Sequence, residues 1–330
     1  MAERNTYIDF LRFVGLSFIV LAHVGCPPTL HQIRCCDVPL MLFVSGLSYS
    51  GKKVSASWKE YYWPRIKRLV IPIYIFVACY TLFSAIFGSP QPTDVIAKSF
   101  LLCYEGAIGY VWVIKIFLLI MLVTPLLIKL NERISNGTFF ATLVGLIVLQ
   151  EGVVAFSDLL PAGIVKFGYN ETIPYLVGYS IPFLLGLRLR KASVKTENIV
   201  LVVTVCAAIG LGIYLRLCVN SEALITDSKY PPHSLFLLYG LATAAVLWKM
   251  RGILGSVTKA RWISFIGSNT IWIYVWHTLF VILVPMVCGQ WLVKFLLVYA
   301  CAVGVYYLQY RLVTRKGDIR DRKFLKYFVG

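Results

Sequence analysis

Long apolar stretches alternate with short polar stretches along almost the whole chain. A run of about 20 apolar residues is long enough to cross a bilayer as a helix. The pattern predicts ten membrane spans, at 8–26, 34–50, 69–88, 111–129, 138–156, 172–187, 198–218, 233–249, 268–287 and 292–311. The second and sixth are short, which favours tilted or partly re-entrant helices there. The expected fold class is all-α, a polytopic membrane helix bundle.

Basic residues indicate the orientation of this bundle. With the N-terminus inside, strict alternation places 25 of the 32 Lys and Arg residues in inner segments. The outer loops hold only four, Arg34, Lys98, Lys166 and Lys229. Because cytoplasmic loops of membrane proteins are enriched in Lys and Arg, we expect both chain ends to be cytoplasmic. Residues 1–311 then form one transmembrane domain, and 312–330 form a basic cytoplasmic tail.

The composition agrees with a membrane protein. Of 330 residues, 59% are hydrophobic and 14% are charged, and the formal net charge is +17. A soluble domain carries about 25% charged residues. The positive charge sits between apolar runs, so it favours membrane orientation and lipid contact over nucleic-acid binding. The cysteines lack metal-ligand spacing, so no metal is expected, and a disulfide among Cys26, Cys35 and Cys36 stays open.

The first predicted span carries three ionisable residues, Asp9, Arg12 and His23. At about 100° per residue all three share one helix stripe, and His23 lies about 16 Å beyond Arg12 along the axis. Ionisable groups inside a bilayer are costly and mark function by default. A histidine here would suit a general base. An interfacial Asp9–Arg12 ion pair and a buried, hydrogen-bonded histidine explain the pattern equally well.

Two arginines lie at the inner mouth of the third span. Arg65 and Arg68 are three residues apart and share a helix face. Guanidinium groups bind phosphate oxygens in bidentate fashion, so the pair suits a cytoplasmic phosphate or pyrophosphate. Anchoring to anionic lipid is the alternative.

Three polar residues share one face of the ninth span, Thr270, Tyr274 and His277. His277 is a candidate second site histidine, although structural hydrogen bonding explains an isolated Tyr–His pair as well. Motifs of soluble enzymes such as G-x-x-x-x-G-K-[ST], H-E-x-x-H and G-x-S-x-G are missing from the sequence.

Taken together, these residues resemble acyltransferase family 3, the integral membrane O-acyltransferases. That family opens with an Arg, ten residues and a His, which Arg12 and His23 match. Further similar motifs follow in the same order, namely Val38 to Gly46 ending in Ser-Gly, Arg65-x-x-Arg68 with Pro72, Trp112 opening the fourth span, Tyr230-Pro231-Pro232, and Gly267-Ser268-Asn269 through Tyr274 and His277.

The resemblance implies transfer of an acyl group, most simply acetyl, from cytoplasmic acyl-CoA to a hydroxyl of an envelope or exported glycan. The protein would lie in the cytoplasmic (inner) membrane, with acyl-CoA as co-substrate and no permanently bound cofactor. His23 would act as general base on the acceptor hydroxyl. Arg12, held by Asp9, would orient the CoA end, and Arg65 and Arg68 would hold its phosphates. A covalent acyl-enzyme stays open.

The remaining candidates are acceptor or support residues, Ser45, Trp112, Tyr274 and His277, and for Ser45 helix packing is favoured. Trp112 is followed by Val-Ile-Lys where an aromatic residue often follows in the family, which leaves the acceptor open. The competing functions are a transporter or flippase of a lipid-linked glycan and a non-catalytic subunit or sensor. Transporters often show internal repeats, and no repeat is visible here. An oligomer is compatible with the sequence.

Overall fold

The computed structural model of the protein describes residues 5–52, 54, 57–108, 110–218, 224–255, 257–284, 288–314 and 328. Within these ranges the secondary structure is helical and contains no strand, so the predicted all-α class is confirmed. In chain order the elements are α1 (Thr6–Ala22), α2 (Pro28–Ile33), η1 (Arg34–Cys36), α3 (Asp37–Tyr49), η2 (Trp58–Tyr62), α4 (Trp63–Ile86), α5 (Thr93–Phe100), α6 (Trp112–Arg133), α7 (Asn136–Leu159), α8 (Ile164–Asn170), α9 (Ile173–Leu189), α10 (Val194–Cys218), α11 (Ser234–Lys249), η3 (Met250–Gly252), η4 (Val257–Lys259), α12 (Arg261–Ser268), α13 (Thr270–Leu283) and α14 (Trp291–Thr314).

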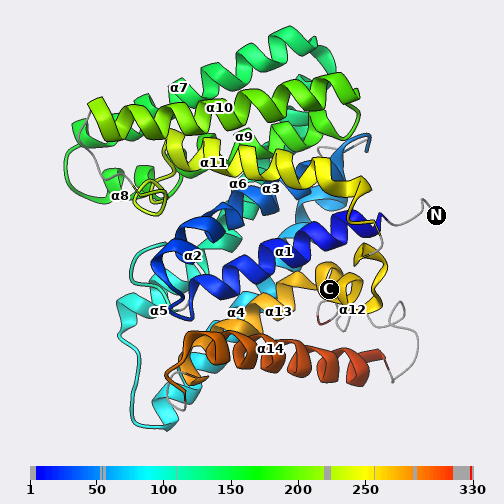
Figure 1. Ribbon diagram of the computed structural model, residues 1–330. Coiled ribbons are helices and arrows are strands. Elements are labelled where there is room, and N and C mark those ends of the chain that lie inside the picture. Colours follow the sequence, from blue (N-terminus) through cyan, green and yellow to red (C-terminus); the bar gives the residue numbers. More distant parts are fainter. Residues whose placement is uncertain are drawn as a thin grey trace.

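The long helices run side by side and form a bundle (Figure 1). Helices α7, α9, α10 and α11 form one side of it, α1, α3 and α6 the middle, and α4, α13 and α14 the other side. The short helices α2, α5 and α8 gather at one end of the bundle, and α12 lies at the other end beside the start of α1. The bundle thus has two distinct ends, and its middle layer can hold a site enclosed by helices.

Outer helices of the bundle expose apolar side chains. In the most apolar stretch of α10 only 6% of residues are buried, and in α7 and α14 only 17%, whereas 72% are buried in the α8–α9 segment. Apolar surface on this scale suits contact with lipid. The protein is therefore a multi-pass membrane protein.

The predicted spans can be compared with the helices one by one. Each of the ten predicted spans coincides with a helix, but α3 has 13 residues and α13 has 14. Six helices in the described ranges are long and apolar enough to cross a membrane, and α12 with α13, bent by 83°, would be a seventh. Ten spans and cytoplasmic ends stay predictions. The predicted tail falls mostly on residues 315–327 and 329–330, outside the described ranges.

Helices α3 and α9 cross at very close range through two glycines. A Cβ at Gly46 would overlap the carbonyl oxygen of Phe183, and a Cβ at Gly186 would overlap that of Phe43. Small residues at a crossing let membrane helices pack backbone to backbone. The contact fixes α3, which carries part of the site, against the most buried helix of the bundle.

Local signals set both ends of α1. The side chain of Asn5 caps the helix and accepts hydrogen bonds from the amides of Tyr7 and Ile8 at 3.1 and 3.2 Å. The helix ends at His23, whose amide still bonds the carbonyl of Val20, and Gly25 follows at φ +71°. His23 is thereby held at the end of α1 opposite the cap.

Three cysteines surround the segment that follows α1. Cys26, Cys35 and Cys36 are buried and carry free thiols in the structure. The disulfide that the sequence left open is therefore not formed here.

Candidate functional site

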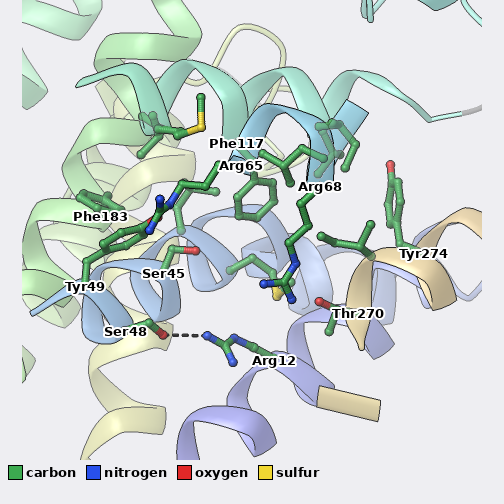
Figure 2. A pocket seen from close by; sticks show the side chains of 18 of the residues that line it. Arg12, Ser45, Ser48, Tyr49, Arg65, Arg68, Phe117, Phe183, Thr270 and Tyr274 are labelled. Atoms are coloured by element: carbon green, nitrogen blue, oxygen red, sulfur yellow. Dashed lines mark hydrogen bonds between the residues drawn. The ribbon is translucent and has the colours of Figure 1, made fainter. Parts of the chain in front are cut away.

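A cavity of about 600 Å³ lies among α1, α3, α4, α6 and the α12–α13 bend (Figure 2). Its two ends differ in chemistry. The described residues that line it are Arg12, Leu16, Ile19, Met41, Leu42, Ser45, Ser48, Tyr49, Lys52, Pro64, Arg65, Arg68, Leu69, Val113, Ile114, Phe117, Ile120, Met121, Thr124, Phe183, Gly267, Ser268, Thr270, Ile271 and Tyr274.

Four cations line this cavity, Arg12, Lys52, Arg65 and Arg68, and none of the described residues in its wall is acidic. They come from the start of α1, the end of α3 and the start of α4, which lie at one end of the bundle. Figure 2 shows the three guanidinium groups entering the same space. Cations of one sign in a low-dielectric cleft create a strong positive potential. This end of the cavity is therefore built for a polyanion.

Arg12 is held by a carboxylate and a hydroxyl. Its guanidinium lies 3.1 Å from Asp9 and donates to Ser48 at 2.8 Å, so the ion pair predicted from spacing forms. Asp9 is buried, whereas the Arg12 side chain is 31% exposed. Gly267 lets α12 approach, because a Cβ there would overlap the carbonyl oxygen of Asp9. Arg12 is thus fixed in direction while its outer nitrogens face the cavity.

Arg65 is held in place by aromatic residues. It donates to the hydroxyl of Tyr49 and to the carbonyl of Tyr61, both at 2.9 Å, and its guanidinium stacks 4.0 Å above the Tyr61 ring. Arg68 is exposed and extends toward Thr270 across the cavity. The two arginines predicted to share a helix face therefore enter one cavity, one of them rigid and the other freer to adapt.

Lys52 belongs to the same group of cations. Partial burial and the nearby charges of Arg12 and Arg65 lower the pKa of its ammonium group from its ordinary value. Crowded cations of this kind repel one another until an anion binds between them. In the sequence analysis Lys52 contributed only to the count of basic residues in the inner segments. Its position just after the predicted second span was the one feature that could have marked it as a site residue.

The other end of the cavity is apolar and closes at Tyr274. Its wall there includes Leu16, Ile19, Met41 and Val113. Ser45 also lines the cavity, whereas its neighbour Gly46 makes the close helix contact, so packing is not the only role open to Ser45. An amphiphilic ligand with an anionic head and a slender, mostly apolar arm would match this arrangement.

His23 lies beyond the cavity wall rather than in it. The ring of Tyr110 stacks on its imidazole with centroids 3.5 Å apart, and the His277 ring centroid is 5.6 Å away. Tyr274 joins the two regions, since its ring lines the cavity and its hydroxyl donates to the carbonyl of Tyr110. Tyr274 and Tyr110 therefore lie between the cavity and His23.

The histidine pair has unused nitrogens. His277 is fully buried, and its Nδ1 bonds the carbonyl of Tyr274. A carbonyl only accepts, so Nδ1 carries the proton and Nε2 is a bare acceptor. Nε2 of His277 and Nδ1 of His23 are both buried without a hydrogen-bond partner among the described residues. Nε2 of His277 therefore offers an acceptor to a hydroxyl group that enters beside His23.

Trp112 lies apart from the cavity. It packs among Tyr104, Tyr230 and Tyr175, with ring centroids 5.6, 5.1 and 6.3 Å away. This aromatic cluster lies near α2, α5 and α8 and can support that end of the bundle. Tyr110, which the sequence analysis did not single out, is nearer to His23 than Trp112 is, and only its place just before the fourth span could have drawn attention to it.

Within the described ranges no group of three or more His, Cys, Asp or Glu residues could hold a metal ion. The described site combines a buried imidazole with a nearby cavity that carries four cations at one end. Comparisons with curated proteins and with solved structures found no match. A family model described as an acyltransferase domain matches residues 5–311. The chain belongs to acyltransferase family 3, and is a membrane acyltransferase.

Proposed function

We propose that the protein transfers an acyl group, most simply acetyl, from cytoplasmic acyl-CoA to a hydroxyl of a cell-envelope or exported glycan. The observation that carries the proposal is the cavity whose cations, Arg12, Lys52, Arg65 and Arg68, occupy one end while apolar side chains occupy the rest. CoA has the matching shape, with a pyrophosphate and a 3′-phosphate at one end and a slender pantetheine arm at the other.

The phosphates of CoA would lie among the arginines. Arg65 and Arg68 offer guanidinium groups for bidentate contacts, and Arg12 adds a third whose direction Asp9 fixes. These contacts would hold acyl-CoA through its phosphates, at a distance from the reacting thioester. The pantetheine arm would then run along Leu16 and Ile19 toward Tyr274.

His23 would act as the general base. In a direct transfer the acceptor hydroxyl gives its proton to His23, and its oxygen attacks the thioester carbonyl. The carbon–sulfur bond breaks, and the departing CoA thiolate takes the proton back from the imidazolium. The bare Nε2 of His277 would accept a hydrogen bond from a second acceptor hydroxyl and orient the sugar.

The predicted orientation gives this reaction a direction across the cytoplasmic membrane. With the N-terminus inside, the cationic end faces the cytoplasm, where CoA is made, and His23 lies in the outer half. Both substrates then approach from opposite sides, and Tyr110 and Tyr274 must turn aside for the acceptor hydroxyl at His23 to reach the thioester carbonyl.

Purified protein in lipid nanodiscs, supplied with acetyl-CoA labelled in the acetyl group, tests the proposal. We expect label to appear on a glycan and free CoA to appear only when the glycan is present. A transporter or flippase would bind a glycan without releasing CoA, and that result across a broad acceptor panel would contradict the proposal.

A further inference from the structure

Three charged side chains form a buried cluster near the end of α1 that holds His23. Asp37, the first residue of α3, lies 2.9 Å from Arg34 and 2.9 and 3.0 Å from Lys229. All three side chains are at most 4% exposed. Arg34 also contacts the ring of His31 at 2.6 Å. The cluster ties the segment before α11 to the start of α3 and holds one more cation than anion.

An unmatched cation in a membrane protein's interior is unfavourable unless an anion compensates it. Among the described residues, Asp227 is a further carboxylate near this cluster, and it is exposed. His31 is only partly buried, so one side chain separates Arg34 from the surface on that side. The excess positive charge lies within reach of a ligand that enters from this end.

Unused hydrogen-bond donors accompany the excess charge. Nε of Arg34 and the hydroxyl of Tyr179 are buried without a hydrogen-bond partner among the described residues. Tyr179 lies close enough to Asp37 and Cys35 for their charges to act on it. A guanidinium nitrogen can only donate, and a hydroxyl can donate, so an anionic oxygen would satisfy both.

Unpaired imidazole nitrogens lie in the same region. Nδ1 of His23 and Nε2 of His277 are buried without partners among the described residues. Arg34 and Lys229 lie close enough to His23 to act on its charge, and η1, which contains Arg34, packs against α1. A hydrogen-bond acceptor for a hydroxyl thus lies in the same region as donors for an anion. An acidic sugar carries both a hydroxyl and an anionic group, so it complements this region.

We propose that the acceptor is an anionic glycan, and that Arg34, Lys229 and Tyr179 bind its carboxylate or phosphate group while a hydroxyl of the same glycan meets His23. The proposal rests on the proposed function, since it assigns the acceptor of that reaction. It specifies that the acceptor glycan is anionic, which the proposed CoA cavity does not determine.

Direct binding tests this site without any acyl transfer. The full chain in nanodiscs is titrated with a uronate oligosaccharide, with its carboxyl-reduced neutral form and with a matching glycosyl phosphate. We expect at least one anionic ligand to bind about tenfold more tightly than the neutral form, and the tighter one identifies the acidic group. Equal affinity for all three would overturn the proposal.

Tyr179→Phe gives the sharpest variant, because it removes only a buried hydroxyl that has no hydrogen-bond partner among the described residues. Loss of one hydrogen bond to a charged group should weaken binding of the anionic glycan about tenfold and leave the neutral form unchanged. Tyr214→Phe on the exposed face of α10 is the control. No change with Tyr179→Phe, or an equal loss for both ligands, would contradict the assignment.

Lys229→Gln, with half-buried Lys166→Gln as control, extends the test to catalysis. We expect a higher KM for the anionic acceptor and an unchanged KM for acyl-CoA. Transfer to neutral and anionic acceptors with equal kcat/KM would reject the anionic site and leave the transferase standing. Anion-selective binding that Tyr179→Phe weakens, without transfer to any glycan, would uphold the site and reject the transferase.

Discussion

The ring of Tyr110 stacks on the imidazole of His23, with ring centroids 3.5 Å apart. The carbonyl of Tyr110 also accepts a hydrogen bond from Tyr274, which closes the cavity. The proposed base is therefore shielded by an aromatic face on the side of the proposed donor site. Such shielding keeps water from competing with the acceptor, since exclusion of water prevents hydrolysis of a reactive acyl group.

Tyr110→Leu should uncouple the reaction. Without the stacked ring, water reaches His23 and takes the place of the acceptor, so CoA release without a glycan should increase severalfold. The amount of labelled acetate released without a glycan measures this hydrolysis of acetyl-CoA directly. Tyr214→Leu on the exposed face of α10 should release no extra acetate. Tight coupling in Tyr110→Leu would show that this ring does not shield the base.

Arg68→Ala should raise the KM for acyl-CoA about tenfold, because a hydrogen bond between charged groups contributes about 1.5–3 kcal/mol. Stability should hardly change, since Arg68 is exposed. Arg65→Ala should raise the KM and also lower the melting temperature, because Arg65 bonds Tyr49 and Tyr61. Initial rates over a range of acyl-CoA concentrations measure both effects. Lys129→Ala, exposed near the inner end of α6, serves as control, and an equal effect there would point to general charge rather than a site.

Binding of acyl-CoA should weaken as the pH rises through the pKa of Lys52. Burial and the charges of Arg12 and Arg65 lower this pKa in the empty protein, and bound phosphates favour the ammonium form and raise it. Binding therefore takes up protons, and affinity falls when the ammonium form is lost. Titration with CoA at increasing alkaline pH should show this loss, and Lys52→Met should flatten it. A profile unchanged in Lys52→Met would place the lysine outside the phosphate site.

Gly46→Ala should destabilise the fold by about 1–3 kcal/mol or more, because the new Cβ overlaps the backbone of α9 and forces the two helices apart. Gly145→Ala on α7 is the matched control, since nothing lies within 4 Å of a Cβ there. Thermal unfolding in detergent compares the two. Equal stability of both variants would mean that α3 and α9 do not need this close crossing.

The helical fold follows from the sequence because apolar run length is a local property that a bilayer makes decisive. The Asp9–Arg12 pair and the shared face of Arg65 and Arg68 were predictable for the same reason, since each depends on spacing within one helix. The length of an apolar run does not by itself fix the number of spans. Helices α3 and α13 are too short for spans by themselves, and the α12–α13 bend lies inside one predicted span.

Spacing along one helix could not predict contacts between segments that are far apart in the sequence. Lys229 and Asp37 are 192 residues apart, and the sequence assigned Lys229 only to an outer loop. Tyr110 and His23 come from different helical regions and meet only through packing. The position of Tyr110 and Tyr274 between the cavity and His23 is likewise a property of the assembled bundle, and helix geometry alone could not predict it.

Acyl transfer by His23→Ala tests the central claim most directly. Purified wild type and variant are compared for labelled acetyl transfer to the glycan and for binding of CoA. Because His23 lies outside the cavity, CoA should bind both proteins equally. Loss of the general base should lower kcat by about 10²–10⁴-fold in the variant. Full transfer by His23→Ala would contradict the account.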